Sequence, residues 1–280
     1  MSPEQRARTT EEVQTETLPN YAAPPVIEVV CSVQFKSLGA FTSIHFGKFL
    51  AWVTDSYPQT EDRTPVADLF EGRPVLQVPE TFDVPPLRRV FYIDSSGNFL
   101  LQLQPTRFMA NWRKLREEDR YPRFDEVERR FLEGWDVFLR FAADQELGTP
   151  QANQYELTYI NHIVALDDQE EFPAATERFM PWFSWTSCRS LGFLPPPSGL
   201  GMRLRFDLPD KRGVLHLKLE HGRRQTDGKD VLLVEFTARG PAEPDWSNMR
   251  SWFSTAHEWI VKGFTDLTST QAHVRWGRVQ

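Results

Sequence analysis

A pattern of three predicted strands followed by a long aromatic helix occurs twice in this chain. In the first half, the strands RRVFYID, FLLQLQ and TRFMANWRK precede a helix with Phe124, Phe131 and Trp135 on one face. In the second half, MRLRFDLP, VLHLKLEHG and VLLVEFTARG precede a helix with Trp246 and Phe253 on its apolar side. The strand triplets start 114 residues apart (202 − 88), and the helices start about 121 apart (245 − 124). These similar offsets indicate an internal structural duplication.

A long helix that lies across a twisted antiparallel sheet covers one face of that sheet. We therefore predict an α+β fold with two similar lobes, each an antiparallel three-strand meander covered by a long aromatic helix. The sheets of the two lobes are either separate or joined edge to edge. The predicted boundaries are a flexible tail over residues 1–23, an N-terminal lobe over 24–171 and a C-terminal lobe over 172–280, with one continuous domain as the alternative. The tail is predicted because the first twenty residues are polar and charged, with little to bury.

Composition narrows the class of protein. The formal net charge of −7 argues against a wholly basic nucleic-acid binder, though not against a local basic patch. No apolar run approaches the roughly 20 residues that span a bilayer, so no membrane association is expected. The first residues lack the apolar core of a secretory signal, and two cysteines are too few for a disulfide scaffold. We expect a cytoplasmic protein.

Three short stretches carry a resemblance to a known family. They are PPVIEVVCSVQF near the start, YELTYINHI in the middle and HEWIVKGFTDLTS near the end. On these motifs the chain resembles an uncharacterised, sporadically distributed bacterial protein family of about this length. The resemblance implies no established enzymatic activity and a patchy occurrence, which suits accessory genes in antiviral defence or mobile-element neighbourhoods. It supplies no catalytic residues.

Motifs for metal, phosphate or nucleophilic chemistry are missing from the sequence. The histidines never pair at zinc-ligand spacing, and no GxxxxGK[ST], GxGxxG or GxSxG motif occurs. His257 and Glu258 begin an HExxH pattern, but Val261 stands where the second histidine is needed. We therefore predict no catalytic residue, no metal site and no cofactor.

The strand YELTYINHI contains the polar cluster that best fits a small-molecule pocket, formed by Tyr159, Asn161 and His162. Because successive strand residues point to opposite faces, Tyr159 and Asn161 share one face while His162 lies on the other. Together with the sheet, Tyr159 and Asn161 could line a pocket. The simpler alternative is that Asn161 ties down a strand end through backbone hydrogen bonds.

Aromatic residues outside the predicted helix stripes point to partner binding. This set comprises Trp182, Trp185, Trp252, Trp259 and Trp276. The last helix is apolar over more than one face, which is typical of a helix that is sandwiched or that docks a partner.

Basic residues gather on the second strand triplet, and Arg203, Arg205, Arg223 and Arg224 are the candidates there for nucleic-acid contacts. Acidic residues are interleaved with them, which is typical of a mixed solvated surface. Nucleic-acid binding is therefore considered but not favoured.

Three functions follow from these observations. The preferred one is a non-enzymatic interaction or accessory protein that binds another protein, or a second copy of itself, through the aromatic second lobe. The alternative is a small-molecule-binding protein or enzyme with a pocket between sheet and helices. The third is a nucleic-acid binder that uses the basic meander.

Overall fold

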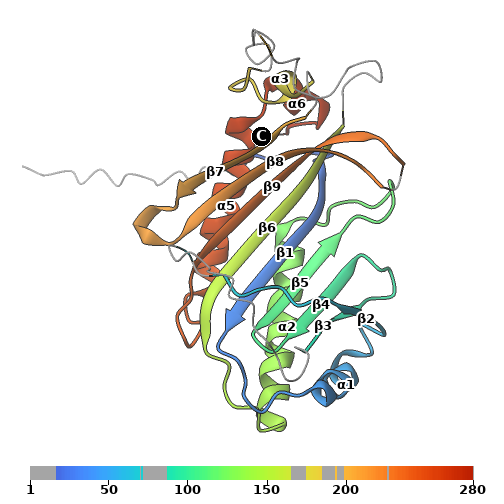
Figure 1. Cartoon of the computed structure of the whole chain (residues 1–280), viewed down its shortest axis with the longest axis vertical. Coiled ribbons are helices and arrows are strands. Elements are labelled where there is room, and N and C mark those ends of the chain that lie inside the picture. The colour runs from blue at the N-terminus through green and yellow to red at the C-terminus, as the bar shows by residue number, and fades with distance from the viewer. Residues whose placement is uncertain are drawn as a thin grey trace, which may run out of the picture.

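One antiparallel sheet organises the fold. The structure is a computed structural model that describes residues 17–69, 71, 87–164, 175–184, 193, 199–225 and 227–279. Its nine described strands follow the order β2-β3-β4-β5-β1-β6-β9-β8-β7 (Figure 1). The strands are β1 Val26–Phe35, β2 Gln59–Arg63, β3 Arg89–Ile93, β4 Phe99–Gln104, β5 Arg107–Arg113, β6 Ala152–Val164, β7 Gly201–Asp207, β8 Val214–Arg223 and β9 Asp230–Pro241. The helices are α1 Ser43–Val53, α2 Phe124–Asp144, α3 Thr176–Phe179, α5 Met249–Leu267 and α6 Thr270–Arg275, with a short 3-10 turn at Pro209–Lys211.

The prediction of two lobes, each with its own covered sheet, is wrong. Strands β1 and β6 are antiparallel neighbours at the centre of the single sheet, with Val29 opposite Tyr159 and Cys31 opposite Leu157. A strand left at the edge of a separate lobe would present a row of unpaired backbone groups. Pairing β1 with β6 satisfies those groups and merges the two halves of the chain.

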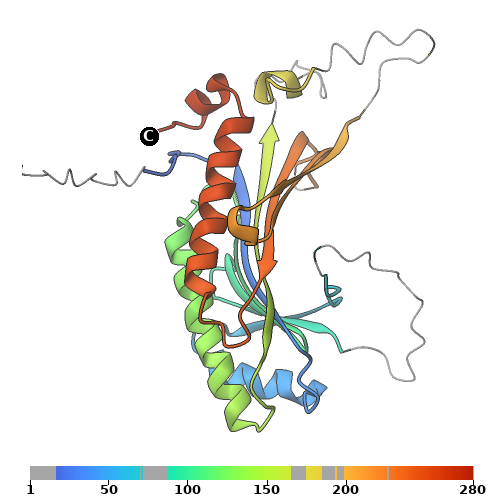
Figure 2. The same cartoon turned by 90° about the vertical axis from the view of Figure 1, so that its left-hand side faces the viewer.

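Helices α2 and α5 lie on the same face of the sheet (Figure 2). Helix α2 packs on β1 and β5, where the ring of Phe138 stacks on Phe35 and Phe108 at centroid distances of 5.6 Å each. Helix α5 packs on β6, where Trp252 and Tyr155 have ring centroids 5.5 Å apart. The aromatic stripes of both helices thus fill one core layer between helices and sheet.

The opposite face of the sheet, called here the open face, carries many polar side chains. Its side chains come from the alternate positions of the same strands, and several are buried: Ser32, Gln34, Gln102, Arg107, Asn111 and Gln154. The open face is crossed by the chain that follows β2, which runs in front of the sheet in Figure 1. The two faces therefore differ in chemistry: the helix-covered face is aromatic, whereas the open face combines buried polar side chains with a small apolar cluster of Phe91, Ile93 and Leu100.

The end of the predicted tail belongs to the folded structure. Tyr21 is only 5% exposed, and its hydroxyl lies 2.8 Å from Oγ1 of Thr265 on α5. The backbone N–H of Ala22 donates to the carbonyl of Gly277 at 2.9 Å. Residues 1–16 of that tail lie outside the described residues. Residues 18–26 form a strap beside α5, and several of them line a cavity between the strap and that helix.

Candidate functional site

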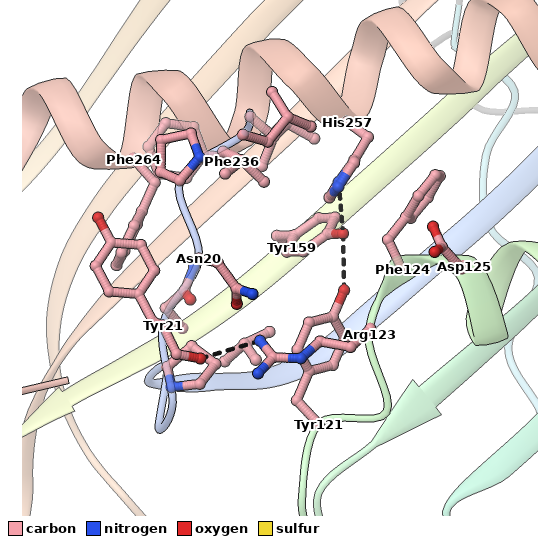
Figure 3. A pocket seen from close by; sticks show the side chains of 17 residues that line it. Asn20, Tyr21, Tyr121, Arg123, Phe124, Asp125, Tyr159, Phe236, His257 and Phe264 are labelled. Carbon is pink, nitrogen blue, oxygen red and sulfur yellow. Dashed lines mark hydrogen bonds between the residues drawn. The ribbon is translucent and has the colours of Figure 1, made fainter. Parts of the chain in front are cut away.

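A cavity of about 290 Å³ lies between β6, helix α5, the start of α2 and the strap of residues 18–26 (Figure 3). Most of its wall is aromatic or aliphatic. The main lining residues are Tyr21, Val26, Tyr121, Phe124, Tyr159, Asn161, Phe236, His257, Ile260 and Phe264. A concave, mostly apolar site with a few polar groups is the usual form of a small-molecule pocket.

Three polar side chains form a hydrogen-bonded chain along the cavity wall. The hydroxyls of Tyr121 and Tyr159 are 2.9 Å apart, and the Tyr159 hydroxyl lies 3.0 Å from Nδ1 of His257 (Figure 3). Tyr159 projects from the helix-covered face of β6, and Tyr121 lies just before α2. His257 is held from the side because its ring stacks on Phe124, with centroids 4.1 Å apart.

Burial sets the protonation states of the three hydrogen-bonded side chains. It raises the pKa of both tyrosine hydroxyls, so Tyr121 and Tyr159 are protonated at neutral pH. It lowers the pKa of His257 to about 4, so the imidazole is neutral at pH 7. All members of the Tyr121–Tyr159–His257 chain are therefore uncharged.

The hydrogen bonds among these three uncharged side chains can run in two directions. If Nδ1 of His257 accepts, Tyr159 donates to it and Tyr121 donates to Tyr159, which leaves the Tyr121 oxygen free to accept. If Nδ1 carries the proton, both bonds reverse, and the Tyr121 hydroxyl is free to donate. The Tyr121 end can thus match either a donor or an acceptor on a bound molecule.

The cavity mouth carries a cation held in an unusual backbone conformation. Arg123 precedes α2 with a φ of 79°, in the left-handed region that non-glycine residues seldom adopt. Its Nη1 donates to the carbonyl oxygen of Tyr21 at 3.0 Å, which fixes the guanidinium between strap and cavity. Asp125 lies on the other side, next to Phe124 (Figure 3). Such strained positions often mark binding sites.

Of the predicted ligand residues, the structure brings Tyr159 and Asn161 together on this cavity and places His162 elsewhere. The Nδ2 of Asn161 donates to the carbonyl oxygen of Val234 at 3.1 Å, so this residue also ties β6 to β9. His162 lines a separate groove on the open face with His221 and Arg224. Burial lowers the pKa of His162, with a smaller contribution from Arg224.

Sequence reasoning missed Tyr121, Arg123 and His257. One signal for His257 was available, because it occupies a position on the apolar stripe that Phe253, Ile260 and Phe264 share. A polar residue on such a stripe is expected to find a buried partner. Nothing in the sequence signals the positive φ of Arg123.

The tryptophans predicted to bind a partner occupy different environments. Trp252 and Trp276 are 2% and 5% exposed, so both belong to the core and cannot contact a partner directly. Trp259 is half-buried against that core. Trp182 is 40% exposed, and its Nε1 donates to the carbonyl of Leu267 at 2.9 Å. Trp185 lies outside the described residues.

The arginines considered for nucleic-acid contacts are largely engaged with carboxylates. Arg205 lies 3.8 Å from both Glu71 and Asp207. Arg223 lies 3.3 Å from Asp230, and Arg224 forms an ion pair with Asp227. Arg203 projects from the same face of β7 as Arg205, because the two residues are two positions apart. These pairs reduce the positive potential of the surface.

Two further properties concern metal and membrane. Within the described residues, no group of three or more His, Cys, Asp and Glu side chains is arranged to hold a metal ion. In the same part of the chain, no helix combines the length and apolar character needed to cross a bilayer.

Comparisons with known proteins give no relative. No protein-family model matches the chain, and neither a curated protein nor a solved structure is significantly similar to it. The resemblance to a sporadic bacterial family therefore stays a prediction from three motifs.

Proposed function

We propose that this protein binds a small organic molecule with an aromatic body and a carboxylate in the cavity between β6, α5 and the strap. The observation that carries the proposal is the buried Tyr121–Tyr159–His257 chain, which runs along a cavity lined with aromatic rings. Buried polar groups in an apolar wall orient a ligand that apolar contact alone would leave free to rotate.

The size of the cavity suits a substituted ring. An engineered apolar cavity of about 150 Å³ in another protein holds benzene. The cavity here is about 290 Å³ and therefore has room for a ring with substituents. The rings of Phe124, Phe236 and Phe264 line it and offer the apolar surface that such a ring would cover.

Polar groups on the cavity wall define the substituents. Arg123 uses one N–H on the Tyr21 carbonyl and has further donors in its planar fork, which match a carboxylate. Tyr121 can exchange a hydrogen bond with a ring hydroxyl in either direction. A hydroxybenzoate-like molecule combines these features.

Binding is proposed in preference to catalysis. Burial keeps both tyrosine hydroxyls protonated, and a protonated phenol is a poor nucleophile at neutral pH. The neutral state of His257 likewise leaves the part of the wall formed by Tyr121, Tyr159 and His257 uncharged. Such a wall favours the apolar body of a ligand over a charged one.

The test measures binding of benzoate and 4-hydroxybenzoate to the full chain by titration calorimetry. We expect 4-hydroxybenzoate to bind more tightly than benzoate and Tyr121→Phe to remove that difference. Arg123→Gln should weaken both ligands about tenfold, since a charge-assisted hydrogen bond contributes roughly 1.5–3 kcal/mol.

The matched control for this titration is Arg129→Gln. Arg129 is exposed on α2 and pairs with Glu126 and Glu133, away from the cavity, so both affinities should stay unchanged. The proposal fails if neither acid binds at millimolar concentration, or if the Tyr121 and Arg123 variants bind as the parent chain does.

A further inference from the structure

A stretch of the chain crosses the open face of the sheet. This crossing segment consists of residues 66–69 and 71, and it follows β2 (Figure 1). Its contacts begin at Gln104 on β4, pass Gln34 on β1 and end at Arg239 on β9. It therefore passes over the centre of the sheet on the side away from α2 and α5.

Side-chain amides of the sheet recognise the backbone of the crossing segment. The Nε2 of Gln104 donates to the carbonyl of Val66 at 2.9 Å, and its Oε1 accepts from the N–H of Val66 at 3.0 Å. The Oε1 of Gln34 accepts from the N–H of Leu69 at 3.3 Å. Contacts to backbone groups do not depend on side-chain identity and are a common basis of peptide affinity.

Two carboxylates of the segment meet specific partners. The hydroxyl of Thr106 donates to Oδ1 of Asp68 at 2.9 Å. The Oε1 of Glu71 lies 2.6 Å from Nε2 of His216 and accepts from Nη1 of Arg239 at 3.3 Å. The sheet thus contacts acidic residues at positions i and i+3 of this segment.

Other residues of the sheet hold Arg239, the cation that contacts Glu71, in position. Glu156 on β6 accepts from Nε of Arg239 and also lies 3.5 Å from Nη1 of Arg107, which is 1% exposed. This buried network fixes the guanidinium of Arg239 with one edge toward Glu71. A pre-positioned cation loses little side-chain entropy when a carboxylate binds.

The open face also has buried polar atoms that make no hydrogen bond to the crossing segment. Within the described part of the chain, the buried side-chain atoms without a hydrogen-bond partner include three on this face: Oγ of Ser32, Nε of Arg107 and Nε2 of Gln154. A groove of about 690 Å³ borders Glu71 and continues past Gln154 and Lys211. Unsatisfied buried donors require an explanation in a folded protein, and a peptide ligand supplies one.

We infer that the open face is a docking surface for an extended acidic peptide of a partner protein, with carboxylates three positions apart, and that the crossing segment occupies this surface in the free protein. The segment serves as a template for the partner because the sheet binds its backbone and its two carboxylates. This surface lies on the side of the sheet opposite the cavity walls formed by α5, so it is independent of the proposed ligand site.

A tethered segment competes strongly with a free peptide, since tethering gives it an effective concentration on the order of millimolar. The test therefore weakens the tethered copy. The probe is a fluorescein-labelled peptide with the sequence of residues 64–71, TPVADLFE, and fluorescence anisotropy measures its binding to the full chain. We expect Glu71→Gln to bind the peptide at least about tenfold more tightly than the parent chain does.

Two further measurements make the test specific. A peptide with asparagine and glutamine in place of the two acids should bind the Glu71→Gln chain about tenfold more weakly. Adding His216→Gln to Glu71→Gln should weaken the acidic peptide, because His216 contacts that carboxylate. Glu61→Gln is the matched control, since Glu61 pairs with Arg63 on β2 and should leave peptide binding unchanged.

Melting temperatures establish that each variant is folded. The inference is overturned if the folded Glu71→Gln chain fails to bind the acidic peptide, or if it binds the acidic and neutral peptides equally. It is also overturned if Glu61→Gln enhances binding as much as Glu71→Gln. Any of these results would show that the crossing segment only covers the sheet. None of them bears on benzoate binding, so the two proposals fail separately.

Discussion

The hydroxyl of Tyr159 on β6 lies 3.0 Å from Nδ1 of His257 on α5, a contact between residues 98 positions apart. Because Tyr159 is the middle member of the chain, Tyr159→Phe leaves both Tyr121 and His257 without this partner. Tyr121→Phe removes only the end. An orphaned buried group costs about 1–3 kcal/mol, against about 1 kcal/mol for one ordinary hydrogen bond.

We therefore expect Tyr159→Phe to lower the free energy of unfolding by about 2 kcal/mol and Tyr121→Phe by about 1 kcal/mol. Urea unfolding followed by circular dichroism measures both values. Equal losses, or a larger loss for Tyr121→Phe, would show that the two hydroxyls do not act as one chain.

Stability should fall on acidification because of His257. Burial holds its folded-state pKa at about 4, below the ordinary value of 6.5. Below pH 6.5 the unfolded chain takes up a proton that the folded chain excludes, so the unfolded state gains stability until the pH reaches about 4. We expect this residue to remove about 2 kcal/mol between pH 7 and pH 5.

The measurement compares urea unfolding of the parent chain with that of His257→Gln at both pH values. The variant should lose about 2 kcal/mol less on acidification, although it is less stable at pH 7 because the bond to Tyr159 is gone. If the two proteins lose equal stability between pH 7 and pH 5, His257 is not the titrating group.

Gly240 allows the loop before β8 to lie against the end of β9. A Cβ on Gly240 would lie 1.9 Å from the carbonyl oxygen of Arg212 and 2.5 Å from Nε1 of Trp252. That Nε1 donates to the same carbonyl at 2.9 Å, so an added methyl group would separate α5 from the sheet. Gly240→Ala should therefore destabilise the fold by about 3 kcal/mol.

Gly222→Ala is the matched control, because a Cβ there meets nothing within 4 Å. We expect it to change the melting temperature by less than a few degrees. A mild effect of Gly240→Ala, similar to that of Gly222→Ala, would contradict the close approach of backbone and indole.

The strand patterns predicted the faces of side chains better than the neighbours of strands. Alternation along YELTYINHI put Tyr159 and Asn161 on one face and His162 on the other, and the structure has this arrangement. The pairing of β1 with β6 was not predicted. The alternation of apolar and polar residues along a strand indicates which of its faces is buried. The pairing of Cys31 with Leu157, in contrast, depends on residues that are distant in sequence.

The cavity residues were harder to predict for the same reason. Tyr121 and Arg123 lie in the loop just before α2, and Tyr21 lies in a segment whose composition is that of a tail. His257 lies on the last long helix, α5. These four positions come together only when the two halves of the chain share one sheet. Composition predicted the tail because it weighs polar residues, but Tyr21 packs against α5 and Trp276, and backbone hydrogen bonds at Ala22 and Ala23 hold the same segment.

Ion pairing on the basic meander argues against nucleic-acid binding. Binding to phosphates requires cations on the protein that replace the counterions of the nucleic acid. Here Arg223 is paired with Asp230, and Arg224 is paired with Asp227. Arg205 lies between Glu71 and Asp207. The whole chain also carries a formal charge of −7.

We expect no shift of a labelled duplex at sub-micromolar protein and about 0.15 M salt. A shift that survives competitor would contradict this. In that case Arg203, Arg205, Arg223 and Arg224 replaced together by alanine should flatten the salt dependence, because phosphate contacts set its slope.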